Sequence, residues 1–217
     1  MIARAARRTA LALALALAST GAAGCGAVLV PKVPLGHGWP ATPPTAHDFK
    51  KIDRQLTRHA TLRAGFQQVL DVHATLRTPA WRAAWAEREI EVRALPPAEA
   101  DALRAEARAA AEGDYEVTLV VVAYERAEND LDHGERSIWR LALINDAGVE
   151  TPASEIKRDR RPRDVLRTEV ATYGDFAEVY LARFPRTADV LHPGAKQVQL
   201  KIAGTRGRVV LTWEAPE

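Results

Sequence analysis

Hydrophobic positions recur at helical spacing in three segments of this 217-residue chain. The first follows a Thr-x-x-Asp capping pattern and predicts a short N-terminal helix over 46–60. The second begins at Thr78-Pro79, a hydroxyl cap followed by proline at the first helical position. A further proline pair separates it from an alanine-rich third segment. The last two segments predict a helical insert at about 79–112.

The rest of the chain alternates apolar and polar residues, which is the period of β-strands. The strands predicted from this pattern are 69–76, 117–124, 137–144, 149–156, 177–184, 197–203 and 208–213. Segment 117–124 is apolar on both faces, which favours a central, buried strand. Gly204 and Gly207 indicate a tight turn between the last two strands.

Short strands separated by glycine turns favour an antiparallel sheet structure in which strand 69–76 joins the later strands across the helical insert. The predicted fold class is therefore α+β: an immunoglobulin-like β-sandwich with a helical insert at about 79–112 and a short N-terminal helix. The expected domain organisation is one domain over 46–217. This is an analogy at the level of fold, and it carries no function.

The N-terminal residues have the three-part layout of a secretory signal peptide. Arg4, Arg7 and Arg8 precede an apolar run over 9–18, and small residues follow up to Gly24. A transmembrane helix needs about 20 consecutive apolar residues, and this run is about half as long. A signal peptide over 1–24 is therefore predicted.

The four residues Ala22-Ala23-Gly24-Cys25 resemble the lipobox of bacterial lipoproteins, although Ala22 stands where that family usually has leucine. The resemblance implies cleavage before Cys25, the only cysteine, and attachment of acyl chains such as palmitate to it. Cys25 would then anchor the protein to a membrane of the cell envelope. Gly26 is not acidic, which favours the outer membrane, on its periplasmic or surface-exposed face, over the inner membrane.

Residues 25–45 combine the candidate lipidated cysteine with a proline-rich stretch. Proline at this density favours extended chain, and 20 residues at about 3.1 Å each would reach roughly 60 Å. The segment is therefore expected to act as a tether between membrane and domain.

The charge balance depends on the signal peptide. The whole chain carries a formal net charge of +2, but loss of three arginines leaves 27 Lys and Arg against 28 Asp and Glu, a net charge of −1. A chain so close to neutral has no electrostatic signature of nucleic-acid binding. A single cysteine also excludes an intramolecular disulfide.

The densest polar cluster contains Asp130, Asp132 and His133. These residues are candidates for a metal site, but their spacing fails the calcium-loop pattern, and a solvated loop is favoured. The predicted metal and cofactor content is therefore none. The histidines form no paired zinc motif in sequence, although His73, on the less apolar face of its strand, could meet His59 or His133 in space.

No arrangement of residues predicts a catalytic site, and no nucleophile motif or phosphate-binding loop is present. A basic run is a candidate contact surface for an anionic partner, and an exposed loop neutralised by nearby aspartates is the alternative. This run consists of Lys157, Arg158, Arg160, Arg161 and Arg163. The tryptophans within periodic segments are expected in the core rather than as glycan platforms. They are Trp81, Trp85, Trp139 and Trp213.

The sequence therefore favours a membrane-tethered envelope lipoprotein that acts through contacts with an envelope protein partner and is not an enzyme. A lipid-anchored hydrolase or metal-dependent enzyme is one alternative. A binding module for a glycan or small ligand is the other.

Overall fold

The computed structural model describes residues 31–36, 38–187 and 189–216, which belong to one compact unit, Pro31–Glu217. The predicted signal peptide and Cys25 lie outside the described residues. Within the described part of the chain, no helix combines the length and apolarity needed to cross a membrane.

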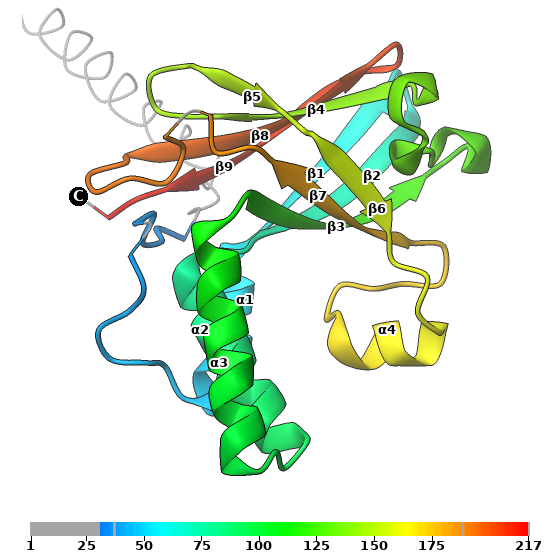
Figure 1. Ribbon diagram of the computed structural model, residues 1–217. Coiled ribbons are helices and arrows are strands. Elements are labelled where there is room, and N and C mark those ends of the chain that lie inside the picture. Colours follow the sequence, from blue (N-terminus) through cyan, green and yellow to red (C-terminus); the bar gives the residue numbers. More distant parts are fainter. Residues whose placement is uncertain (1–30, 37, 188, 217) are drawn as a thin grey trace, which may run out of the picture. The chain divides into compact units, whose positions relative to one another are not determined.

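The described chain is an α+β structure with two antiparallel sheets and several helices (Figure 1). The five-stranded sheet contains, in spatial order, β1 Thr57–Ala64, β2 Gln67–Leu76, β3 Tyr115–Ala123, β7 Glu178–Phe184 and β6 Glu155–Arg158. The four-stranded sheet contains β5 Glu150–Pro152, β4 Trp139–Ile144, β8 Gln197–Gly204 and β9 Gly207–Glu214.

Inward-facing residues of both sheets join in one hydrophobic core. Two of the largest buried side chains, Trp139 and Trp213, come from the four-stranded sheet, and Tyr180 and Phe184 come from β7 of the other. The indole N–H of Trp213 donates to the Leu56 carbonyl at 2.6 Å, so its one polar atom is satisfied in the core. Trp81 is also buried, and the core expectation is confirmed for these three tryptophans.

The helical insert is confirmed as α2 Pro79–Val92 and α3 Pro97–Glu112. Thr78 caps α2 by accepting a hydrogen bond from the Trp81 backbone N–H at 3.2 Å. The strands that flank the insert, β2 and β3, pair with each other, so strand 69–76 does join the later strands across the insert, as predicted. Arg186 closes the C-terminal end of α3 by donating to the carbonyls of Ala111 and Gly113.

The N-terminal helix is shorter than the predicted 46–60. A 3-10 turn, η1 Ala46–Asp48, leads into α1 Phe49–Leu56, and the chain then enters β1. Backbone pairing of β1 with β2 explains the difference, because it satisfies donors and acceptors that a short exposed helix would leave to water. The helical spacing of Phe49 and Leu56 was correct, since both are buried.

The predicted strand 149–156 is in fact two strands in different sheets. β5 pairs with β4, whereas β6 pairs with β7, and the chain changes sheet between them. The exposed loop considered for the basic run from Lys157 to Arg163 is also shorter than that run at both ends. Lys157 and Arg158 belong to β6, and Arg163 begins a helix absent from the prediction, α4 Arg163–Glu169.

Part of the predicted tether lies against the domain. Val33 and Leu35 are buried, and the Val33 N–H donates to the Glu214 carbonyl of β9 at 2.8 Å. The guanidinium of Arg108 on α3 lies 5.6 Å from the ring centre of Trp39. An apolar residue at every second position lets this segment pack along a sheet edge despite its prolines.

Between β3 and β4 the chain forms two 3-10 segments, η2 Arg126–Glu128 and η3 Leu131–Arg136. Asn129 is buried between them, and its side-chain amide donates to the Val121 carbonyl. The hydroxyl of Tyr180 donates to the Asn129 carbonyl at 2.8 Å, so this loop is fixed to the core.

Candidate functional site

The outer face of the five-stranded sheet, turned away from the core, is polar over its first three strands. On β1 and β2 the outward positions include Thr57, His59, Asp71, His73 and Thr75, while their neighbours in sequence face the core. Helices cover much of this face: the α2–α3 hairpin and α4 lie on the same side of the sheet (Figure 1). Polar groups are therefore enclosed between sheet and helices.

Two adjoining cavities lie in this space, one of about 680 Å³ and one of about 520 Å³. They share wall residues from α1, β1, α2, the end of α4 and the segment after it, and we call them together the arginine groove. The shared residues are Phe49, Asp53, Thr57, Arg88, Glu169, Ala171 and Thr172.

Cationic side chains outnumber acidic ones in the arginine groove, nine to five. The cationic residues are Lys50, Arg54, Arg58, Arg77, Arg82, Arg88, Arg93, Arg161 and Arg183. The acidic residues are Asp53, Glu89, Glu106, Glu116 and Glu169. Two acids at the rim, Glu155 and Asp159, pair with Arg183 and Arg161, and the positive excess persists when they are counted.

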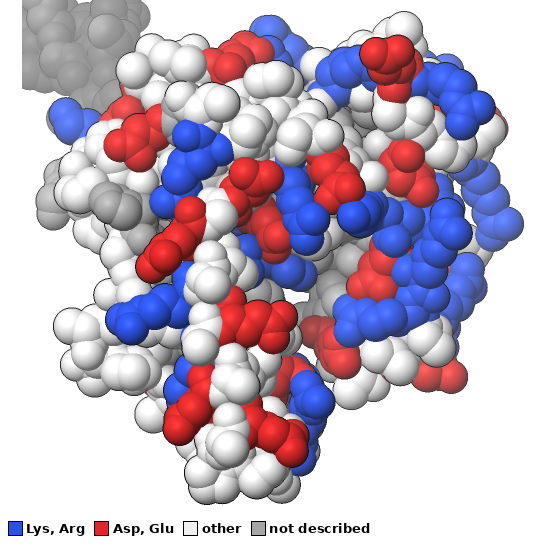
Figure 2. Space-filling model, viewed as in Figure 1, with Lys and Arg blue, Asp and Glu red and all other residues white. Residues whose placement is uncertain are grey.

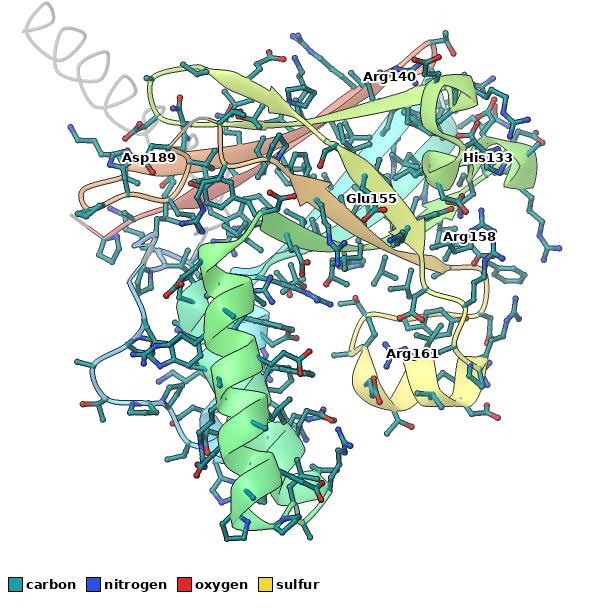
Figure 3. All side chains as sticks on the ribbon, viewed as in Figure 1. His133, Arg140, Glu155, Arg158, Arg161 and Asp189 are labelled. Atoms are coloured by element: carbon teal, nitrogen blue, oxygen red, sulfur yellow. The ribbon has the colours of Figure 1, made fainter. Side chains whose placement is uncertain are left out.

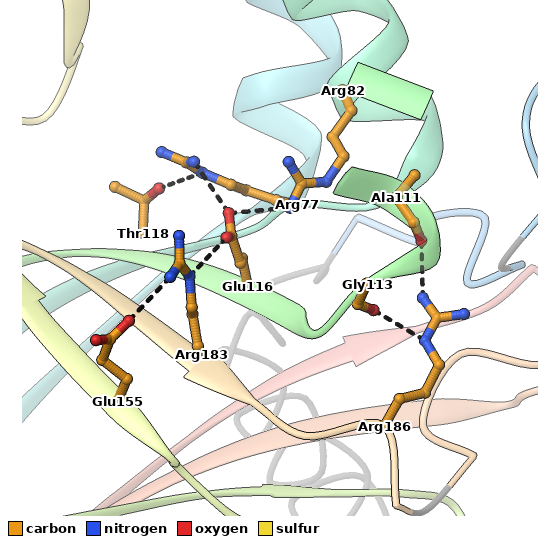
Figure 4. Close-up of polar contacts among 9 residues, drawn as sticks. All are labelled: Arg77, Arg82, Ala111, Gly113, Glu116, Thr118, Glu155, Arg183 and Arg186. Carbon is orange, nitrogen blue, oxygen red and sulfur yellow. Dashed lines mark hydrogen bonds and ion pairs between the residues drawn. The ribbon is translucent and has the colours of Figure 1, made fainter. Parts of the chain in front are cut away.

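The floor of the groove is an ion-pair network centred on Glu116 of β3 (Figure 4). One carboxylate oxygen accepts from Arg82 at 2.9 Å and from Arg77 at 3.2 Å, and the other accepts from Arg183 at 3.0 Å. Arg183 continues to Glu155 at 2.9 Å. Three guanidinium groups thus converge on one carboxylate that is 12% exposed.

Aromatic rings form one wall. Phe49 of α1 meets Trp81 edge to face with ring centres 5.6 Å apart, and Trp81 is nearly parallel to Trp85 at 6.5 Å. The Arg77 guanidinium lies 5.0 Å from the centre of the Trp81 ring. Trp85 is half-buried and lines the groove, so the core prediction for this tryptophan was only partly right.

Two carboxyl groups of the groove have pKa values displaced in opposite directions. Burial raises the pKa of Asp53, and the hydrogen bond from the Trp81 indole at 2.8 Å offsets only part of this. Burial acts in the same sense on Glu116, but the charges of Arg82 and Arg77 outweigh it and hold the pKa of Glu116 below its ordinary value. Glu116 is therefore a fixed anion near neutral pH.

At the outer end of the groove, His59, Asp71 and His73 lie together on β1 and β2. His59 Nε2 lies 2.7 Å from Asp71 Oδ1, and the two imidazole rings stack with centres 4.3 Å apart. Hydrogen bonds from Thr61 and His59 lower the pKa of Asp71 despite burial, whereas burial and the neighbouring His59 lower the pKa of His73. Of the two histidines that the sequence left open as neighbours of His73, His59 and His133, the structure places His59 beside it.

The candidate metal ligands predicted near η3 form hydrogen bonds or ion pairs with the protein, or are exposed. Asp130 accepts from the Ser137 hydroxyl at 2.9 Å and the Ile138 N–H at 3.2 Å, and Asp132 pairs with Arg158 at 3.1 Å. His133 is exposed. Across the described residues, the one group of three potential metal ligands within mutual reach is His59, Asp71 and His73.

The basic run does not form one surface, because its members pair with different partners. Figure 3 labels two of them, Arg158 and Arg161. Arg158 points inward and donates to the Asn129 carbonyl, Asp132 and the Tyr180 hydroxyl. Lys157 pairs with Glu155 on the other face of β6. Arg161 lies by α4, pairs with Asp159 and Glu169, and is the member of the run that lines the groove.

Arg160 and Arg163, the remaining members of the run, are exposed. On the face shown in Figure 2, Lys and Arg gather on the side that carries α4. Acidic residues are interleaved among them. This face is therefore mixed in charge rather than uniformly basic.

Comparison with known proteins adds little. No family model matches the sequence, and no curated protein is significantly similar to it. The structure is similar to a crystal structure of a protein of unknown function from Burkholderia pseudomallei K96243, with 16% sequence identity and a TM-score of 0.34. The match covers 77% of this chain and 88% of the other, and its low TM-score supports no inference about this protein.

Proposed function

We propose that this protein is a lipid-anchored binding module of the cell envelope, and that the arginine groove holds an organic anion with an apolar or planar part. The observation that carries the proposal is a half-open groove with more guanidinium than carboxylate groups, set against a wall of aromatic rings. Guanidinium groups suit carboxylate and phosphate because their donors form a planar fork. Aromatic walls suit flat or apolar groups.

The groove has cationic groups left over for a ligand. Lys50, Arg54 and Arg93 form no ion pair within the described part of the chain, and all three are exposed where the groove opens. Arg77, Arg82 and Arg183 are held by Glu116 and would hold the floor rigid. The alternative is that the network only fastens the helical hairpin to the sheet, and in that case no anion would bind.

Anchoring through Cys25 to the outer membrane would place this groove in the cell envelope, with an envelope protein partner as the expected source or recipient of the ligand. We further propose that the two sheets form a β-sandwich, supported by the single core to which both contribute. The immunoglobulin-like connectivity stays a prediction.

Phenyl phosphate, inorganic phosphate and phenol test the binding proposal by calorimetry on the full chain purified in detergent. Phenyl phosphate should bind more tightly than either fragment, and its affinity should fall as salt is raised. Arg93→Ala and Trp85→Ala should each weaken binding by about tenfold, the value of one contact of roughly 1.4 kcal/mol. Arg208→Ala, on the exposed face of β9, is the matched control.

Equal affinity for phenyl phosphate in wild type and Arg93→Ala, with Trp85→Ala also unchanged, would remove the groove as the binding site. Failure of all three compounds to bind the wild type would indicate that the ion-pair network only attaches the helical hairpin to the sheet.

A further inference from the structure

The pairing register of β1 and β2 puts two histidines and an aspartate on one patch of sheet. His59 lies directly opposite His73, and Thr61 lies directly opposite Asp71. Residues in such pairs have Cβ atoms about 4.5–5.5 Å apart, and all four side chains point to the outer face. The patch is fixed by the backbone ladder, so the three titratable groups are held together without relying on a loop.

The side-chain atoms that could bind a metal are already close. One ligand atom each from His59, Asp71 and His73 lies within 4.8 Å of the others. Zinc bonds to histidine and carboxylate are about 2.0–2.2 Å long, so ligand atoms around tetrahedral zinc are roughly 3.3–3.5 Å apart. Small rotations would close that difference, and the His59 side chain is 50% exposed, which leaves it room to turn.

We propose that His59, Asp71 and His73 form a binding site for a divalent transition-metal ion, with zinc as its occupant. Two imidazoles and one carboxylate form the three-ligand set of open zinc sites, in which the remaining position takes water or a further ligand. Magnesium and calcium prefer sites built from oxygen, so this donor set selects against them.

The surroundings of Asp71 fit this role. Its Oδ1 accepts from the Thr61 hydroxyl at 2.7 Å and lies 2.7 Å from His59 Nε2. Its Oδ2 accepts no hydrogen bond from the described residues and is available to a cation. Metal-binding carboxylates are commonly held by such an outer hydrogen bond, which fixes their orientation.

The open side of the site faces the smaller cavity of the groove, which His59 and His73 both line. A small molecule could therefore reach the remaining coordination position of the bound metal. The metal proposal does not depend on the anion proposal, because zinc alone is the probe that tests it.

The test is calorimetric titration of the full chain in detergent with zinc, together with the visible absorption of the cobalt-loaded protein. Wild type should bind one zinc per chain, and cobalt should give the intense bands of a four-coordinate site with nitrogen ligands. His73→Ala and His59→Gln should each lower zinc affinity by about 100-fold or more, and Thr61→Val by about tenfold. His59→Gln retains a group that can donate to Asp71, so it separates loss of a ligand from loss of folding.

The matched control is His192→Ala. His192 is also paired with an aspartate, Asp146 at 3.3 Å, but no group of three potential ligands includes it among the described residues. Zinc affinity should be unchanged in this variant. Absence of zinc binding in wild type, or an equal loss in His192→Ala and His73→Ala, would overturn the proposal. So would wild-type affinity in both His73→Ala and a folded His59→Gln.

Discussion

The Arg82 guanidinium on the first turns of α2 donates to the Glu116 carboxylate of β3 at 2.9 Å, and both side chains are nearly inaccessible to solvent, at 9% and 12% exposure. This contact joins the helical insert to the sheet that it interrupts. It exists because Arg77 pairs through its backbone N–H with the Glu116 carbonyl, and the chain then turns at Thr78 into α2. The insert is thus held by ion pairs where α2 begins and by aromatic packing further along the helix.

Glu116→Gln should destabilise the protein by about 3 kcal/mol, because it leaves Arg82 and Arg77 buried without their counter-charge. Urea unfolding at neutral pH measures this. Glu155→Gln is the control, since Glu155 pairs with the same Arg183 from the exposed rim and should change stability far less. Similar losses of stability in the two variants would show that the buried ion pairs of Glu116 contribute no more to stability than the exposed ion pair of Glu155.

The two displaced carboxyl groups should give opposite pH dependences. The pKa of Glu116 is lowered from its ordinary 4.5, so the unfolded chain binds more protons between the two values, and stability is lost as pH falls below about 4.5. The pKa of Asp53 is raised from 3.8, so the folded chain binds more protons just above that value, and stability falls as pH rises through its folded pKa.

Asp53→Asn should therefore leave stability at neutral pH equal or higher, since Asn keeps an acceptor for the Trp81 indole and carries no buried charge. Urea unfolding between pH 3 and pH 7 separates the variants. In Glu116→Gln the free energy of unfolding should fall less than in wild type as pH is lowered. In Asp53→Asn it should rise more steeply than in wild type as pH is raised. A marked loss of stability in Asp53→Asn at neutral pH would contradict the assignment.

Trp81→Ala and Trp85→Ala should differ in what they impair. Trp81 is 7% exposed and packs on Phe49, so its removal should cost about 3–5 kcal/mol of folding free energy. Trp85 is half-buried at the groove, so its removal should cost only about 1–2 kcal/mol and should mainly reduce binding of phenyl phosphate. Thermal or urea unfolding, followed by calorimetry on the folded variants, distinguishes them.

The sequence alone predicted much of this fold. The helical insert was predicted from local signals, because Thr78 and Pro79 mark the start of α2 independently of tertiary contacts. Alternation predicted β2, and an apolar run predicted β3 as a central strand. The sequence indicated that 69–76 joins the later strands across the insert, but not that β2 pairs with β3. No local sequence signal indicates that the chain passes from one sheet to the other between β5 and β6, so the prediction treated them as one strand, 149–156.

The candidate site was far less predictable. The arginines of the groove are spread from Arg54 to Arg183, and those around Glu116 converge only through the pairing of β2, β3 and β7. His59 fell at the end of a predicted helix, so its register with His73 could not be derived, although it was one of the two histidines left open as neighbours of His73. The one available signal was polar residues at alternate positions of strands otherwise read as core, such as Glu116 and Thr118 on β3.

Cys25→Ala should abolish membrane retention and labelling by radioactive palmitate. The reason is that this residue is the proposed acylation site, and stable anchoring needs more than one lipid chain or signal. Fractionation of cells that express the full chain measures retention. Ser19→Ala, within the predicted signal peptide, is the control and should remain membrane-bound. A Cys25→Ala protein that is still labelled and sediments with membranes would remove the lipobox interpretation.

Arg58→Ala should loosen the segment that leads from the proposed anchor to the domain. Arg58 is 8% exposed, and among the described residues it donates only to backbone carbonyls, those of Pro31, Gln55, Thr57 and Thr212, with its closest contact 2.6 Å to Pro31. Loss of these charge-assisted bonds should cost about 2–4 kcal/mol in stability. Arg58→Lys should recover part of this, because one ammonium cannot reach carbonyls in three separate segments.

The local readout is trypsin cleavage after Lys32, next to Val33 whose N–H is held by the Glu214 carbonyl. Cleavage there should be faster in Arg58→Ala than in wild type under conditions where both are folded, because the carbonyl of Pro31 loses its donor. Arg208→Ala should be cut at the wild-type rate. If the protein is anchored through Cys25, the same cut should release the domain from membranes, so more protein should be released from Arg58→Ala than from wild type treated for the same time. Unchanged cleavage in a folded Arg58→Ala protein would mean that the packing of Val33 and Leu35 alone holds this segment to the domain.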